Sequence, residues 1–159
     1  MRLGKAIYAG LAGGIAMSIL GFLARAGGMQ LDAEMMLGTM LGSAPSSGTW
    51  AVGLVIHLMI SAVIALAYAA GFEYVTHRAS AGLGAAFSLI HIVVAGMFMA
   101  MMPALHPMIP EQMPAPGAFL VNMGAAHTTL FVVEHLMYGA IVGGMYGAVL
   151  HPRARPVVA

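Results

Sequence analysis

The chain has 159 residues, of which 61% are hydrophobic and only 7% are charged. Because a soluble domain carries about 25% charged residues, this composition excludes a water-soluble globular protein and predicts one integral membrane domain, residues 1–159, in contact with the lipid bilayer. The net charge of +1 excludes a nucleic-acid partner, and the absence of cysteine excludes disulfides and thiolate metal sites.

Four apolar stretches are each long enough to cross the hydrocarbon core, which needs roughly 20 residues per helix. The predicted spans are about 6–24, 50–72, 81–102 and 125–150. The first is longer than the apolar core of a cleaved signal peptide, so we interpret it as a retained span. The third is predicted to end at Pro103 and the fourth at Pro152, because proline interrupts a helix.

Basic residues predict the orientation of these spans. Arg2 and Lys5 precede the first span, Arg78 lies between the second and third, and Arg153 and Arg155 follow the fourth. Four crossings place all of them on one side, which the positive-inside rule assigns to the cytoplasm. We therefore expect a multi-pass protein of the bacterial inner (cytoplasmic) membrane, with both termini in the cytoplasm.

The two segments on the outer side are predicted to be folded. Arg25 lies at the outer end of the first span, and we expect it to snorkel or to pair with Asp32 or Glu34. Asp32 is a suitable N-cap for a short helix lying on the outer membrane surface and ending at Gly42. The second outer segment has five prolines between residues 103 and 116, which predict a folded cap in place of a long helix.

The second and fourth spans are similar to each other when they are aligned at an offset of 78 residues. Six of 14 aligned positions are identical, including His57 with His135 and Tyr68 with Tyr146. The implied repeats are parallel helix–loop–helix units, at about 1–74 and 79–152. The predicted fold class is all-α: an integral membrane four-helix bundle of two such repeats with a short outer interfacial helix, and with both histidines at one depth.

Glycines at helical spacing mark close-packing faces on two spans. Gly10 and Gly14 form one GxxxG pattern, and Gly139, Gly143 and Gly147 form two more. Small residues let helix backbones approach in lipid. These faces either pack within the bundle or dock a partner chain or a flat cofactor.

Ionisable side chains inside a span are costly in lipid, so they are functional candidates. The spans place such side chains at His57, His91, His127, Glu134 and His135. One interpretation is structural: each imidazole donates an N–H to a carbonyl or hydroxyl group of a neighbouring helix and locks the bundle.

A second interpretation is a haem b site. Histidines at equal depth on two helices can ligate haem iron axially, which assigns His57 and His135 as the axial ligands. His91 or Glu134 would then orient a ligand through a hydrogen bond.

A third interpretation is a metal site, for which copper suits the residues best. Thioether and imidazole groups are ligands that Cu(I) prefers, and methionines end the third span and continue into the following loop, at Met97, Met99, Met101, Met102, Met113 and Met123. The candidate metal ligands are His57, His91, His106, Met108, His127, Glu134 and His135.

Three short segments carry a resemblance to a known family. They are the glycine-rich opening at 9–17, the LDAE…LG segment at 31–38 and the closing EHLMYGAIVG at 134–143. The chain resembles small four-helix bacterial inner-membrane proteins of unknown function, the YagU-like group and related families. The resemblance implies the fold and the location, and it supplies no reaction.

The sequence contains neither an H-E-x-x-H motif nor a phosphate-binding loop. We therefore expect a non-catalytic protein, an accessory or structural subunit of a larger membrane complex with a membrane-protein partner or a second copy of itself. The alternatives are a haem- or copper-binding protein in electron transfer or metal handling, and a small transporter with the His/Glu cluster as a proton relay.

Overall fold

The computed structural model describes residues 1–150 and side chains as far as Gly147, so the predictions for Pro152, Arg153 and Arg155 lie outside the described residues. The long helices are α1 (Leu3–Ala26), α3 (Ser47–Ala70), α4 (Ala81–Leu105) and α5 (Ala125–Leu150). A π-helical turn, η1 (Gly71–Thr76), continues α3, and two short helices, α2 (Ala33–Thr39) and η2 (Ala118–Met123), lie in the connections. The all-α four-helix prediction is confirmed, and all four long helices are long and apolar enough to cross a membrane.

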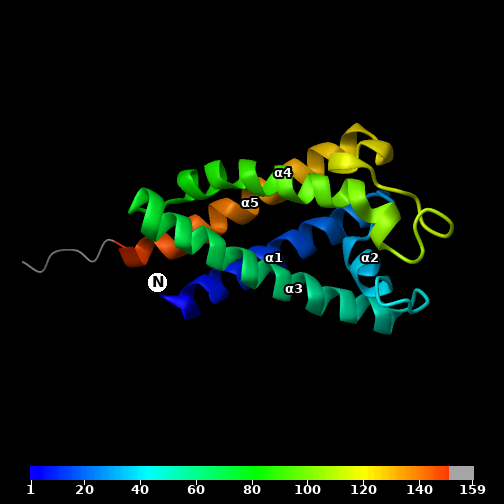
Figure 1. Ribbon diagram of the computed structural model, residues 1–159, viewed down its shortest axis with the longest axis horizontal. Helices are drawn as coiled ribbons and strands as arrows, with labels where there is room; N and C mark the ends of the chain where they lie inside the picture. The colour runs from blue at the N-terminus through cyan, green and yellow to red at the C-terminus, as the bar shows by residue number, and fades with distance from the viewer. Residues whose placement is uncertain (151–159) are drawn as a thin grey trace, which may run out of the picture.

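The long helices run alternately up and down, so α1 begins and α5 ends at the same end of the bundle (Figure 1). We call this the terminal end. The opposite end carries α2 and the segment 106–124, and we call it the capped end. The predicted cytoplasmic side corresponds to the terminal end, and that assignment stays a prediction.

Side-chain caps begin three of the helices. The Asp32 carboxylate accepts from the Met35 N–H (2.8 Å), as its position in the sequence predicts. Ser46 accepts from the Thr49 N–H at the start of α3, and Ser80 begins α4 in the same way. Each cap satisfies one backbone donor that would otherwise have no partner.

The predicted end of the third span at Pro103 is wrong, because α4 continues to Leu105 with Pro103 inside its last turn. The helix ends before Pro107. His106 has an extended backbone (φ −103°, ψ 125°), which is the conformation that a following proline imposes.

Glycines lie where the helices approach one another most closely. A Cβ on Gly10 would meet Ala65 and the Ser61 carbonyl at 2.6 Å, so α1 lies directly on α3. On α5, the three glycines of the predicted packing face lie against α4 and the residues just before it, and a Cβ on Gly139 would collide with the Gly84 carbonyl. Both glycine faces therefore lie inside the bundle, where backbones approach most closely.

The terminal half of the bundle has a dense aromatic core. Tyr68, Phe72, Tyr138 and Tyr146 are all nearly inaccessible to solvent, and small alanines fill the space between them. Phe72 stacks on Phe87 of α4 with ring centroids 5.2 Å apart. These contacts hold α3 and α4 together at this end.

Toward the capped end, α3 and α4 diverge (Figure 1). By contrast, α1 and α4 both pack against α5, and α1 packs on α3 as far as the contact between Ser18 and His57. The two sequence repeats thus have different neighbours in the bundle. Toward the capped end, α1 and α5 stay in contact, whereas α3 and α4 separate.

The short outer helix α2 packs onto α3. A Cβ on Gly53 would collide with the Glu34 carbonyl, and one on Gly38 would collide with the Thr49 carbonyl. Met36 and Glu34 are each only 2% exposed. The helix is therefore more deeply integrated than a helix that only rests on a membrane surface.

Candidate functional site

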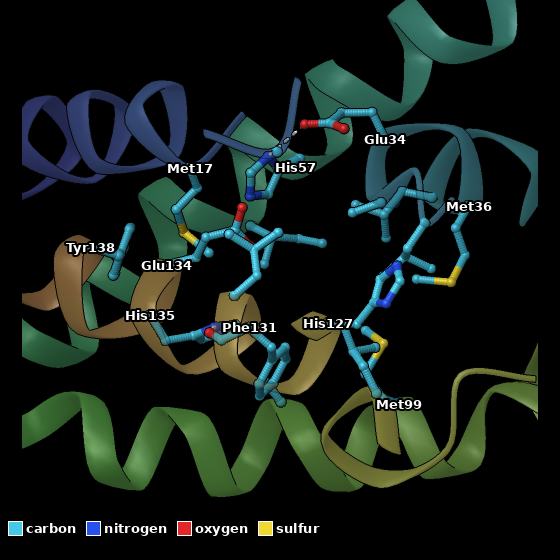
Figure 2. A pocket seen from close by; sticks show the side chains of 18 of the residues that line it. Met17, Glu34, Met36, His57, Met99, His127, Phe131, Glu134, His135 and Tyr138 are labelled. Atoms are coloured by element: carbon cyan, nitrogen blue, oxygen red, sulfur yellow. Dashed lines mark hydrogen bonds and ion pairs between the residues drawn. The ribbon is translucent and has the colours of Figure 1, made fainter. Parts of the chain in front are cut away.

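A cavity of about 380 Å³ lies in the capped half of the bundle (Figure 2). Its walls come from all four long helices together with α2 and η2. This volume lies within the range of small-molecule sites, which is about 300–1,000 Å³. The cavity also contains the ionisable residues that the sequence placed in the spans, namely His57, His91, His127, Glu134 and His135.

The cavity reaches the outside of the bundle between α3 and α4. Ile60 of α3 and Val94 and Phe98 of α4 line it, and these side chains are 42%, 62% and 37% exposed. Because the two helices part here, the opening faces sideways, where lipid acyl chains surround a membrane bundle. We call this apolar opening the lateral portal.

One wall carries an ion-pair network. The Arg25 guanidinium lies 3.3 Å from the Asp32 carboxylate and 3.1 Å from the Glu34 carboxylate. The pairing that the sequence predicted for Arg25 is therefore present with both acids. It connects the end of α1 to α2 and neutralises the buried Glu34. Without this partner, the buried charge of Glu34 would strongly destabilise the folded protein.

His57 lies beside this network. Its Nδ1 is 3.0 Å from the Ser18 hydroxyl of α1 and 3.9 Å from a Glu34 oxygen. The imidazole thus bridges α1, α2 and α3 at the edge of the cavity, as Figure 2 shows for His57 and Glu34.

His91 and His135 are joined through a directed hydrogen-bond chain. The Tyr68 hydroxyl donates to Ser88 (3.1 Å), and the Ser88 hydroxyl donates to the His135 carbonyl (2.8 Å). Since the Tyr68 proton is engaged, the contact between Tyr68 and His91 Nδ1 (3.3 Å) requires Nδ1–H as the donor. We therefore assign the proton of neutral His91 to Nδ1.

His135 has the same tautomer for a different reason. Its Nδ1 donates to the Phe131 carbonyl (2.7 Å), and the residue is only 7% exposed. The Nε2 atoms of His91 and His135 have no partner among residues 1–150, yet neither is fully enclosed. Both residues line the cavity, and their Nε2 atoms are the ring nitrogens that the described residues leave without a partner.

Glu134 is the one cavity carboxyl group without a hydrogen bond or ion pair among the described residues. A Cβ on Gly21 would lie 3.4 Å from its Oε1 and 3.7 Å from Arg25 Nη1, so the carboxyl group extends toward α1. Figure 2 shows Glu134 pointing into the cavity on the side of His57, whereas its sequence neighbour His135 leaves the helix in a different direction, beside Phe131.

His106 lies apart from this cavity, in the cap. Its Nδ1 accepts from the Met108 N–H (3.1 Å), so Nε2 carries the proton and donates to the Met36 carbonyl (2.9 Å). Thr39 contacts the same Nε2 at 3.1 Å. Both ring nitrogens are therefore occupied, and neither has a lone pair free for a metal.

No group of three or more His, Asp or Glu side chains that could hold a metal ion is present within residues 1–150. The rings of His91 and His135 touch edge to face with centroids 4.7 Å apart, so no macrocycle fits between that pair. Haem ligation by His57 and His135, and metal binding by the wider residue set, stay predictions.

Comparison of the chain with protein-family models, with curated proteins and with solved structures produced no significant match. The resemblance to the YagU-like group therefore stays a prediction.

Several residues of the site were not identified from the sequence. Glu34 was predicted only as an alternative partner of Arg25 and not as part of a cavity wall, and Ser18, Tyr68 and Tyr138 were not assigned to the site. The lateral portal had no signal, because it depends on the relative tilt of α3 and α4.

Proposed function

We infer that this chain is a membrane-embedded binding protein for an amphipathic ligand with a protonated amine head, which enters sideways from the bilayer. The observation that carries this proposal is a cavity that combines an apolar lateral portal with an unpaired carboxyl group, Glu134. The ligand's apolar chain would lie in the portal and its head would lie against the polar wall.

The polar groups of the cavity favour a hydrogen-bond donor. The Nε2 atoms of His91 and His135 and the carboxylate of Glu134 are acceptors. An alkylammonium group has three N–H donors and no acceptor, as in lysine, and it matches this set. A carboxylate or phosphate head would present further acceptors to the same wall.

The charged groups of the cavity also favour a ligand with a positively charged head. Among the described residues, Arg25 is the only arginine or lysine that lines the cavity, and it is shared between Asp32 and Glu34. Glu134 thus adds a carboxyl group that has no ion pair of its own among residues 1–150, since the nearby Arg25 already pairs with two acids. A charge in a low-dielectric site requires a partner or must be neutralised by protonation, and a bound ammonium group is such a partner.

The test compares two ligands that differ only in the head. The protein in nanodiscs is titrated with a radiolabelled long-chain primary amine and with the alcohol of equal chain length. We expect Glu134→Gln to weaken amine binding by about tenfold or more and to leave alcohol binding unchanged. Glu111→Gln, an exposed acid of the cap, is the matched control and retains full amine binding.

Two outcomes contradict the proposal. One is amine uptake no greater than that of empty nanodiscs. The other is equal affinity in the wild type and in Glu134→Gln. Nanodiscs made with and without phosphatidylethanolamine distinguish an aminophospholipid from a free amine, because the lipid competes with the probe only when its own head enters the cavity.

An accessory role in a larger complex stays a prediction. The glycine faces that motivated it lie against other helices of the same chain, so they offer no docking surface. Mild-detergent purification with identification of co-migrating chains tests that role. A homogeneous monomer that still binds the amine would support the binding function alone.

A further inference from the structure

His127 has an unusual environment at the capped end of the cavity. Its Nε2 is the one fully buried side-chain nitrogen or oxygen without a hydrogen-bond partner among the described residues. A buried polar atom without a partner costs about 1–3 kcal/mol, and few such atoms occur in native proteins. We therefore expect a bound species, and not another protein group, to be the partner of this nitrogen.

The groups around His127 are thioethers. Figure 2 shows its ring beside the side chains of Met36 and Met99, and all three residues line the same cavity. Met36 and Met99 also belong to one cluster with further methionines of the cap, Met40, Met102 and Met113. A thioether sulfur is only a weak hydrogen-bond acceptor, but it is a good ligand for a soft metal ion.

We propose that His127, Met36 and Met99 form a binding site for one Cu(I) ion at the capped end of the cavity. One imidazole nitrogen and two thioether sulfurs are soft and borderline ligands that select Cu(I), whereas Cu(II) favours nitrogen and oxygen donors in a tetragonal arrangement. The three ligands come from α5, α2 and α4, so the ion would join the cap to the bundle.

The structure also shows which of the methionines and histidines considered from the sequence are not available as copper ligands. Met97 and Met101 are 62% and 53% exposed on the outside of α4, where they meet lipid. His106 has both nitrogens engaged. These residues are therefore not ligands in this proposal, although the sequence placed them near the candidate copper site. The proposal does not depend on the amine ligand.

The test is Cu(I) affinity measured anaerobically by competition with a chromogenic Cu(I) chelator. We expect one Cu(I) per chain, and we expect His127→Gln and the double variant Met36→Leu/Met99→Leu to bind about tenfold or more weakly. Leucine is close to methionine in volume, so the double variant preserves the packing. Met97→Leu on the same helix and His77→Asn at the terminal end are controls that retain full affinity.

X-ray absorption of the copper-loaded wild type gives a second reading that needs no variant. We expect sulfur and imidazole scatterers around copper, with the sulfur contribution lost in the double variant. Absence of stoichiometric Cu(I) binding, a copper shell without sulfur, or unchanged affinity in both ligand variants would overturn the proposal.

Discussion

The two halves of the bundle are built in different ways. In the terminal half, glycines and alanines bring the backbones together around Tyr68, Phe72 and Tyr146, which are all buried. In the capped half, α3 and α4 part, and the space between the helices is a cavity with ionisable walls. The terminal half is held mainly by close packing, whereas the capped half adds the Arg25 ion pairs and buried hydrogen bonds to the methionine-rich packing of the cap.

This difference assigns separate roles to the halves. Close packing in lipid gains mainly from van der Waals contact, and it makes the terminal half a rigid base. The polar network of the capped half keeps charged groups in place without filling the space among them. A site that binds a ligand requires such unfilled space, and a rigid base keeps the walls at fixed positions.

The largest effect is expected where packing is tightest. Gly84→Ala adds a methyl group that would collide with the Gly139 carbonyl, so we expect a loss of about 3 kcal/mol or more in the free energy of unfolding. Gly82→Ala, two residues earlier on the same helix, meets no atom within 4 Å and should be neutral or slightly stabilising. Unfolding by SDS titration, followed by circular dichroism, measures both, and equal losses would contradict the packing argument.

The next effect concerns the ion pairs of the capped half. Arg25→Met keeps an unbranched apolar stem and removes the guanidinium charge, which leaves the buried Glu34 without a cation. We expect a loss of about 2 kcal/mol in the same titration, below the range for fully buried pairs because Arg25 is partly exposed. Adding Glu34→Gln to Arg25→Met should restore most of the loss, and no restoration would show that packing of the arginine stem dominates.

A smaller effect is expected at the boundary between the halves. The Tyr138 hydroxyl donates to the Ser61 carbonyl and so connects α5 to α3. Tyr138→Phe preserves the ring and removes this bond, with an expected loss of about 1 kcal/mol. The thermal melting midpoint in detergent measures it. Tyr8→Phe, a change on an exposed tyrosine of α1, is the control and should leave the midpoint unchanged.

Local features of the sequence predicted much of this architecture. Apolar length predicted the four long helices, and Asp32 was recognised as an N-cap because capping depends on near neighbours. The prediction at Pro103 was wrong because one proline removes a single i→i−4 hydrogen bond and does not by itself end a helix. His106, held extended before Pro107, ends the helix instead.

The internal similarity predicted less than it suggested. Tyr68 and Tyr146 occupy equivalent positions in the alignment, but Tyr68 contacts Ser88 and His91, whereas Tyr146 contacts Glu73 and the Arg2 N–H. The residue type determines which groups a side chain is able to contact. The neighbouring helix determines which groups it contacts in the fold, and the position of that helix depends on tilt angles that short-range sequence patterns do not encode. The cavity is a consequence of those tilts.

The smallest expected effect on stability comes from the residue with the largest expected effect on binding. Glu134 has no hydrogen bond or ion pair among residues 1–150, so its charge contributes little to holding helices together and costs desolvation. Glu134→Gln should therefore leave the free energy of unfolding unchanged or raise it by up to about 1 kcal/mol, measured by the same SDS titration without added ligand. Added amine should stabilise the wild type and not the variant, because a ligand that binds only the folded state raises its stability. A clear loss of stability in ligand-free Glu134→Gln would show that this carboxyl group holds the helices together. Glu134 of α5 would then belong to the same polar network as α1, α2 and α3, and not to a wall that is free to bind a ligand.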